Sequence, residues 1–344
     1  MDPDLLLADL TAGKTAALAR AISAVENARP GFERLLAGVH RSVGRARRIG
    51  VTGPPGAGKS TLVERLVLAY RAAGLKVGVV AVDPTSPFTG GALLGDRIRM
   101  ESVALDDGVY IRSMASRGSV GGLATSTREV SDLLDAAGFD RLLIETVGVG
   151  QSELDVARMA DSTVLVLVPE SGDGIQTLKS GVMEAADVFA VNKADRPGAD
   201  KLRREIEITL GIRRGNAYRN VPAHHGGEAG RRSKQATPER SDDWDHPVVL
   251  TVAAKGEGTE DLITALDLHH DWLARSGSLE QRRRRRTLER TREVVERAAR
   301  RWMWRETRAE HVINQRLDQV VEGTLSPYDV ATEVLDGLKQ GARL

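Results

Sequence analysis

The chain of 344 residues contains no cysteine, which excludes disulfide bonds, thiolate metal sites and a cysteine nucleophile. Aromatic residues make up 3% of the sequence, so we expect a core built from aliphatic side chains. No apolar run approaches the roughly 20 residues that a membrane-spanning helix needs. The net charge of +1 does not by itself imply a polyanionic partner. The N-terminal residues carry acids where a secretory signal would carry bases, and we expect a cytoplasmic protein with no membrane partner.

A glycine-rich stretch from Gly53 to Ser60 matches the pattern G-x-x-x-x-G-K-[ST] of a phosphate-binding loop. The apolar residues 49–52 before it predict a buried strand, and residues 60–70 after it predict an amphipathic helix. Glycines let backbone N–H groups approach phosphate oxygens, and the helix N-terminus adds a positive dipole end. Lys59 should reach the β- and γ-phosphates, and the Ser60 hydroxyl should ligate Mg²⁺. The predicted phosphate-binding residues are Gly53, Pro54, Pro55, Gly56, Ala57, Gly58, Lys59, Ser60 and Thr61.

Short apolar runs and helical patterns alternate along the centre of the chain. The candidate strands are 49–52, 77–82, 109–111, 141–145, 163–168, 188–192 and 248–252, and the candidate helices between them include 61–73, 122–137, 154–160 and 175–185. Nearly continuous apolar runs are typical of parallel strands that are covered on both faces. The pattern predicts an α/β fold with a doubly wound, mostly parallel sheet, in which ligands bind at the carboxyl ends of the strands.

Three parts are expected along the chain: a helical arm at 1–46, a nucleotide-binding domain at 47–274 and a helical dimerisation extension at 275–344. Residues 211–245 are polar and rich in glycine, arginine, histidine and proline, which predicts a long disordered loop. The aromatic content of the C-terminal helices favours a homodimer surface, with a lid over the protein's own domain as the alternative. Residues 282–286 are five consecutive arginines. A solvated or partner-facing helix is favoured over a nucleic-acid site here, because glutamates are interleaved with arginines in this helical stretch and no nucleic-acid motif appears.

Carboxylates follow several candidate strands on the phosphate side. Glu145 ends a buried strand and is the preferred candidate for orienting the attacking water or acting as general base, with Gln151 as the competing candidate. Asp83 and Asp96 could serve Mg²⁺ directly or through water, although a capping or turn role is as plausible for either alone. Gly148 can place its N–H near a γ-phosphate, where glycines let a loop move when that phosphate leaves.

The run Asn192, Lys193 and Asp195 follows the next candidate strand as N-K-x-D, a base-reading motif of GTP-binding proteins. Guanine presents N1–H and its exocyclic amine as adjacent donors, and the Asp195 carboxylate can accept both. Adenine offers no such pair and would leave a buried carboxylate unpaired. The motif therefore predicts that the nucleotide is GTP or GDP rather than an adenine nucleotide.

A second base contact is expected from Ala253, Ala254 and Lys255 after the last candidate strand. Backbone N–H groups here could reach guanine O6, and Lys255 could pack on the base. GTPases often carry a serine near this point, and the alanines make this a backbone-only contact.

Five stretches in this order resemble the MeaB/ArgK family of GTPases: GVTGPPGAGKSTL, VDPTSP, LLGDRIRM, ETVGVGQSE and VNKAD. ETVGVGQSE is the most specific, because most GTPases carry an aspartate where this loop has Glu145. The resemblance implies a P-loop GTPase of the SIMIBI branch, commonly homodimeric, that serves adenosylcobalamin-dependent acyl-CoA mutases, usually methylmalonyl-CoA mutase, as a chaperone. GTP binding and hydrolysis would gate cofactor delivery and protect the mutase from inactivation.

The resemblance also implies residue roles. Asp83, Asp96 and Glu145 would surround the metal and the attacking water, and residues 172–176 would form a mobile switch near the partner. A nickel-insertion GTPase is disfavoured by the absence of cysteine, and a targeting ATPase is disfavoured by Asp195. A SIMIBI-type GTPase for another metallocofactor or a protein-targeting client stays open, as does the identity of the mutase.

Overall fold

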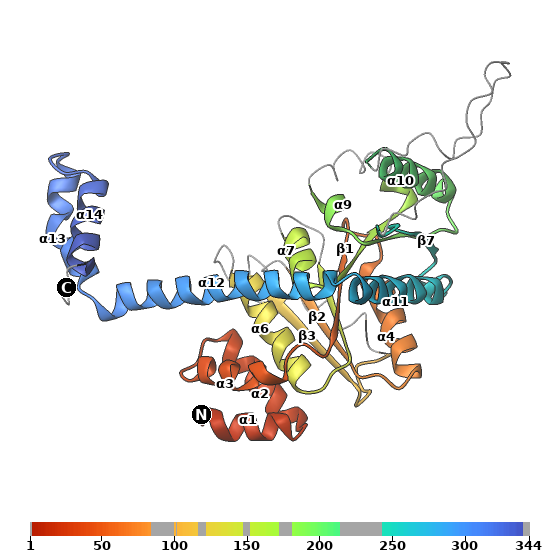
Figure 1. The fold of residues 1–344 in the computed structure, drawn as a ribbon, viewed down its shortest axis with the longest axis horizontal. Helices are drawn as coiled ribbons and strands as arrows, with labels where there is room; N and C mark the ends of the chain where they lie inside the picture. The colour runs from red at the N-terminus through yellow and green to blue at the C-terminus, as the bar shows by residue number, and fades with distance from the viewer. Residues whose placement is uncertain are drawn as a thin grey trace, which may run out of the picture. The chain divides into compact units, whose positions relative to one another are not determined.

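The computed structural model describes residues 2–83, 100, 102–115, 122–146, 152–171, 181–213 and 243–339. Its centre is a seven-stranded sheet with the order β3-β2-β4-β1-β5-β6-β7, in which every neighbouring pair is parallel (Figure 1). The strands are β1 (Arg47–Thr52), β2 (Val77–Asp83), β3 (Val109–Ala115), β4 (Arg141–Thr146), β5 (Ser162–Leu167), β6 (Val188–Asn192) and β7 (Val248–Thr251). The prediction of an α/β fold with a mostly parallel sheet is confirmed, and the observed sheet is parallel throughout.

The helices that flank the sheet lie between successive strands, as expected of crossover connections, except for the last, which follows β7. They are α4 (Lys59–Ala72), α6 (Gly122–Ala136), α7 (Ser152–Met159), the short helices η2 (Pro169–Ser171) and α9 (Val182–Ala185), α10 (Ala199–Arg213) and α11 (Thr259–Arg275). The predicted helix at 175–185 is observed only from Val182, since 172–180 lie outside the described residues. The predicted switch at 172–176 falls in that same stretch.

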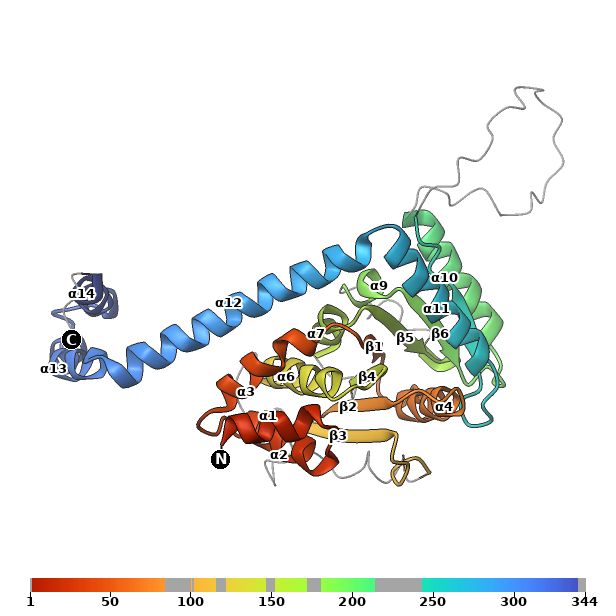
Figure 2. The ribbon, with the colours of Figure 1, turned by 60° about the horizontal axis from the view of Figure 1, so that its bottom comes forward.

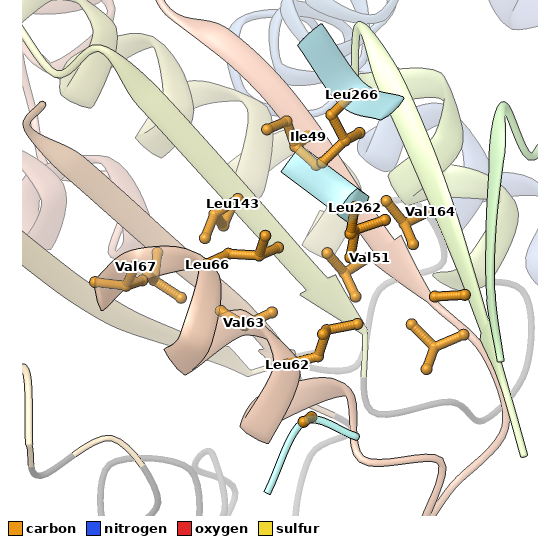
Figure 3. Packing of buried hydrophobic residues seen from close by; sticks show 14 of the residues in the cluster. Ile49, Val51, Leu62, Val63, Leu66, Val67, Leu143, Val164, Leu262 and Leu266 are labelled. Carbon is orange, nitrogen blue, oxygen red and sulfur yellow. The ribbon is translucent and has the colours of Figure 1, made fainter. Parts of the chain in front are cut away.

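The sheet divides two aliphatic cores, because successive strand residues face opposite sides. In β2, Val79 belongs to the core under α4 and α11, whereas Val80 belongs to the core on the other face. The first core is shown in Figure 3, where side chains of α4 and α11 meet those of the central strands: Leu62, Val63, Leu66, Val67, Leu262 and Leu266 against Ile49, Val51, Leu143 and Val164. These packed faces hold the strand ends, and therefore the site, in place.

The N-terminal arm consists of α1 (Pro3–Thr11), α2 (Thr15–Glu26), α3 (Phe32–Val39) and the short helix η1 (His40–Ser42). Its apolar residues share one buried cluster with β2, β3, β4 and α6. Figure 2 shows the ribbon of the arm beside α6. A side-chain ion pair between Glu26 and Arg112 joins α2 to β3, with 2.8 Å between Arg112 Nε and Glu26 Oε1. The arm is therefore part of the same compact unit as the sheet, which runs from Met1 to Arg283.

A second compact unit begins at Arg284. It contains most of α12 (Ser278–Glu306), together with α13 (Ala309–Val321) and α14 (Pro327–Lys339). Arg316 on α13 donates two hydrogen bonds to Glu333 on α14, at 3.0 and 2.9 Å. The unit holds an apolar cavity of about 420 Å³, lined by side chains that include Trp304, Leu317 and Leu335.

The second turn of α12 carries ion pairs to residues at the amino ends of two strands. Arg282 donates to both carboxylate oxygens of Asp187, and Arg283 pairs with Asp161 at 3.1 Å. The prediction of a solvated or partner-facing helix is wrong for these two arginines, because carboxylates distant in the sequence meet them at the amino ends of β5 and β6. Arg285, by contrast, is largely exposed and pairs only with Glu289 on its own helix within the described residues.

The predicted bounds of the disordered loop, 211–245, extend too far at both ends. Residues 211–213 belong to α10, and Trp244 is packed against His269 and Trp272 at ring-centroid distances of 4.7 and 6.0 Å. Trp244 also donates a hydrogen bond to the Asp187 carbonyl at 2.7 Å. Residues 214–242 lie outside the described residues. The apolar body of Trp244 explains the difference, since the polar composition of the stretch concealed one buried anchor.

Among the helices that the structure describes, none combines the length and the apolar character needed to cross a membrane.

Candidate nucleotide-binding site

The phosphate loop follows β1 and leads into α4 through glycines with positive φ. A Cβ atom on Gly53, which has φ of 141°, would lie 2.1 Å from the Val166 carbonyl oxygen, so no side chain fits there. Gly58 has φ of 86° and would place a Cβ 2.4 Å from the amide nitrogen of Asn192. The backbone of the loop therefore lies directly against the ends of β5 and β6, which only glycine permits.

Lys59 occupies the first helical position of α4 and is buried. Its ammonium donates hydrogen bonds to the carbonyls of Gly53 and Pro54, at 2.9 and 3.0 Å. The loop thus curves around a positive charge. A phosphate that entered the loop would meet that charge together with the N-terminal end of α4, where Ser60 and Thr61 form the rest of the first turn.

Ser60 and Glu145 are brought together from α4 and β4. The Ser60 hydroxyl donates to Glu145 Oε1 at 2.6 Å, and both side chains are less than one tenth exposed. The parallel register places Glu145 beside Val51 of β1 and Ala81 of β2, so three carboxyl strand ends converge here. A hydroxyl and a carboxylate are hard oxygen donors, which is the chemistry that Mg²⁺ prefers, and this donor pair fits the ion.

Four of the predicted phosphate-side groups cannot be placed. The Asp83 backbone ends β2, which neighbours β4, but the Asp83 side chain lies outside the described set. Asp96, Gly148 and Gln151 fall wholly outside the described residues.

Asn192 at the end of β6 connects the phosphate loop to the base-side loop. Its side-chain amide donates to the Ala57 carbonyl at 2.8 Å. Its oxygen accepts from the Ala253 N–H at 3.0 Å and from the Thr251 hydroxyl at 3.2 Å. Asn192 is 2% exposed, so these contacts act in a low-dielectric environment where each hydrogen bond is stronger.

Lys193 has φ of 57°, an uncommon conformation for a residue other than glycine. Its ammonium donates to the Gly56 carbonyl at 2.9 Å, which makes a second tie between the N-K-x-D run and the phosphate loop. Asp195 lies on the more exposed side, 3.6 Å from the ammonium of Lys255, and both of these side chains are about half exposed. The structure thus brings the two predicted groups of base-reading residues together.

The loop after β7 is a tight turn closed by a bridge between Val252 and Glu257. The amides of Ala253, Lys255 and Gly256 donate to Asn192 Oδ1, the Val252 carbonyl and the Ala253 carbonyl, respectively. The Ala254 N–H has no hydrogen-bond partner within the described residues. It is therefore the amide of this turn that can serve a ligand without a bond being broken.

Two residues near the site have no role in the sequence analysis. Glu153 on α7 is partly buried, and burial raises the pKa of its carboxyl while the positive charge of Lys59 opposes that rise. Glu153 is the last residue of the stretch ETVGVGQSE, and this position in a family-specific motif could have indicated it as a site residue. Arg65 on α4 donates to the carbonyls of Ala253 and Ala254 at 2.9 and 2.8 Å. No local pattern links these residues, which lie 188 and 189 positions apart.

A parallel α/β sheet that carries a phosphate loop and an N-K-x-D run at one edge is the architecture of a P-loop GTPase. Comparisons with known proteins agree. The family model described as "Methylmalonyl Co-A mutase-associated GTPase MeaB" matches residues 18–308. The chain belongs to this family, and it is a GTPase; the resemblance seen in the sequence is confirmed.

Individual relatives cover most of the chain. A protein of Pyrococcus abyssi, named as a GTPase candidate, is 44% identical over 292 residues, which are 85% of this chain and 83% of its own length. The mouse "Methylmalonic aciduria type A homolog, mitochondrial" is 34% identical over 366 aligned positions, covering 98% of this chain and 79% of its own length. A solved structure titled "Crystal structure of LAO/AO transport system kinase" aligns with a TM-score of 0.66 and 28% identity, covering 98% of this chain and 97% of that chain.

Proposed function

We propose that this GTPase is a chaperone for an adenosylcobalamin-dependent acyl-CoA mutase, either methylmalonyl-CoA mutase or a related mutase. It gates the delivery of adenosylcobalamin and protects the mutase from inactivation. The observation that supports this client is the match over residues 18–308 to a family described by its association with methylmalonyl-CoA mutase. The name of the mouse relative refers to methylmalonic aciduria and points to the same metabolism. A cytoplasmic location is proposed from the composition of the chain alone.

The proposed chemistry is the Mg²⁺-dependent hydrolysis of GTP to GDP and phosphate. Lys59 neutralises the β- and γ-phosphates, and Ser60 and Glu145 hold the metal together with Asp83 and Asp96. The bound Mg²⁺ supplies charge neutralisation at the phosphate oxygens. Glu145 or Gln151 orients the attacking water, while the Gly148 N–H contacts the γ-phosphate. Ser60 and Glu145, which are hydrogen-bonded to each other in this structure, would both offer oxygen ligands to the metal.

Guanine recognition in this proposal uses two groups of residues. Asp195 accepts N1–H and the exocyclic amine, and the turn of Ala253, Ala254 and Lys255 contacts the O6 edge and the base face. Asn192 and Lys193 keep this base pocket in register with the phosphate loop through their bonds to the Ala57 and Gly56 carbonyls. The contacts of Asn192 and Lys193 support a role in positioning the phosphate loop, in addition to any direct contact with the nucleotide.

The test of the client measures steady-state release of phosphate from GTP and from ATP, with and without a purified adenosylcobalamin-dependent acyl-CoA mutase. We expect GTP-selective turnover that rises when the mutase is present, and no turnover from Lys59→Ala. A CoA-binding enzyme that needs no cobalamin serves as the mock partner and should have no effect. A second assay follows loss of mutase activity during turnover, which should slow when this protein and GTP are added.

The outcomes separate the activity from the client. GTP-selective turnover that no cobalamin-dependent mutase changes would overturn the chaperone proposal. It would leave a GTPase that serves another metallocofactor or a protein-targeting client.

We also propose that the C-terminal unit forms a homodimer surface. Within residues 284–339, only Ala309, Val330 and Val334 are buried apolar residues, which is a small core for an independent unit. Apolar side chains of the cavity, including Leu317 and Leu335, are almost half exposed, and a second copy would cover them. Light scattering should show a dimer that Leu335→Glu converts to a monomer. Val321→Glu is the control, since Val321 is more exposed but does not line the cavity. A monomeric wild type would overturn this proposal.

A further inference from the structure

We propose that Arg65 is a specificity-positioning residue of the guanine site. Its guanidinium fixes the peptide group between Ala253 and Ala254, so that the Ala254 N–H is held as the donor to guanine O6. The inference rests on the proposed assignment of Asp195 and residues 253–255 to the base. In this proposal a residue of α4 contributes to base specificity, although the beginning of that helix belongs to the phosphate site.

The contact is a two-pronged hydrogen bond across the molecule. Arg65 Nε donates to the Ala253 carbonyl at 2.9 Å, and Nη2 donates to the Ala254 carbonyl at 2.8 Å. The planar guanidinium presents donors in a fixed fork, so two bonds to successive carbonyls define the orientation of the backbone as well as its distance. The Arg65 stem also lies near Gly256, where an added Cβ would be 3.8 Å from Cδ.

Peptide geometry links this contact to the free amide. A trans peptide is planar, and its C=O and N–H point in opposite directions. No cis peptide occurs among the described residues. Since the Ala253 carbonyl points at Arg65, the N–H of Ala254, in the same peptide plane, points away from it. A charged donor on the carbonyl also polarises the peptide and makes its N–H a stronger donor.

The remainder of the turn cannot supply this positioning from its own side chains. Ala253 and Ala254 have no polar group beyond the backbone, and Lys255 faces Asp195. Gly258, with φ of 73°, closes the turn against the Leu250 carbonyl, which lies 2.1 Å from where a Cβ would be. Asn192 anchors the Ala253 N–H, and Arg65 anchors the next peptide plane. Together they leave the Ala254 amide as the oriented donor.

Comparing the binding of GDP, IDP and ADP distinguishes the contact of the Ala254 N–H with O6 from the other contacts to the base. GDP and IDP both carry O6 and N1–H, and they differ only in the exocyclic amine that Asp195 is proposed to accept. ADP carries an amine in place of O6, and this donor opposes the Ala254 N–H. A variant that loosens the amide should therefore weaken GDP and IDP alike while leaving ADP unchanged.

The experiment measures the dissociation constants of GDP, IDP and ADP by isothermal titration for the full chain and its variants. Arg65→Ala should lower GDP and IDP affinity about tenfold, as expected for the loss of charge-assisted hydrogen bonds, with the GDP-to-IDP ratio unchanged and the GDP-to-ADP ratio reduced by the same factor. Arg65→Lys should give an intermediate GDP-to-ADP ratio, because an ammonium lacks the fork that holds two carbonyls at once.

The matched control is Arg71→Ala, on the same helix. Arg71 donates to Asp106 at 3.0 Å and to the Leu75 carbonyl at 2.8 Å, away from the base loop. Its variant should keep the wild-type GDP-to-ADP ratio even if its melting temperature falls. Because the readout is a ratio of affinities, partial unfolding of either variant does not imitate the expected result.

The outcomes distinguish two failures. A wild type with equal affinity for GDP and ADP would overturn the base-site assignment itself. A wild type that prefers GDP, together with an Arg65→Ala variant that keeps the whole preference or weakens all three nucleotides equally, would overturn the role of Arg65 alone.

Discussion

Replacing Asp187 by asparagine should lower the free energy of unfolding at neutral pH by about 2.5 kcal/mol, and the loss should shrink in acid. Asp187 lies immediately before β6 with its side chain 6% exposed. Its carboxylate accepts from the Thr163 N–H at 2.9 Å and from both terminal nitrogens of Arg282, at 2.8 and 3.0 Å. His269 Nε2 lies 3.3 Å from Oδ1.

The magnitude follows from the pKa of this carboxyl. Burial by itself would raise the pKa of Asp187, but His269 and Arg282 outweigh burial and lower it from 3.8 to about 2. The difference of 3.8 − 2 is about 1.8 units, and at about 1.4 kcal/mol per unit the charged form contributes about 2.5 kcal/mol. Because the folded pKa is the lower one, this contribution is complete well above pH 3.8 and is lost as the pH falls through 3.8 towards 2.

The assay is urea unfolding of wild type and Asp187→Asn at a series of pH values from neutral down to about 3, followed by circular dichroism. The difference in unfolding free energy should stay constant down to about pH 5 and then shrink. Asp271→Asn is the control, because the Asp271 side chain is 64% exposed and its replacement should change stability by less than about 0.5 kcal/mol. A difference at neutral pH as small as that of the control, or one that persists unchanged at about pH 3, would refute the reasoning.

The remaining predictions concern the nucleotide. Lys59→Ala should abolish nucleotide binding in a titration while the far-ultraviolet dichroism is retained, and normal GTP affinity would contradict the loop assignment. Glu145→Ala should spare GDP binding and reduce phosphate release at least about a hundredfold; full activity would transfer the water-orienting role to Gln151 or an aspartate. Asp195→Asn should lower the preference for GTP over ATP, and an unchanged preference would remove Asp195 as the base reader. Gly53→Ala should cost roughly 1–3 kcal/mol in a denaturation experiment, because its Cβ would meet the Val166 carbonyl; a stable variant would contradict the observed backbone.

Local patterns in the sequence determined much of this protein. Alternating apolar runs predicted the strands, because parallel strands buried on both faces need continuous aliphatic residues. The phosphate loop could be read directly, since its glycines are required by backbone conformations such as φ of 141° at Gly53 that other residues rarely adopt. The N-K-x-D run was recognisable for a similar reason, because its chemistry lies in four consecutive positions.

Contacts between distant segments were decided only by the tertiary structure. The strand order β3-β2-β4-β1-β5-β6-β7 brings Glu145 to Ser60, which lies 85 positions away. The packing of α4 beside α11 lets Arg65 meet a turn 188 positions later, and the start of α12 pairs Arg282 with Asp187. An arginine run has the same local pattern whether its partners are water or buried carboxylates. The difference is set by which strand ends the fold places beside it, and no local pattern of residues encodes that arrangement.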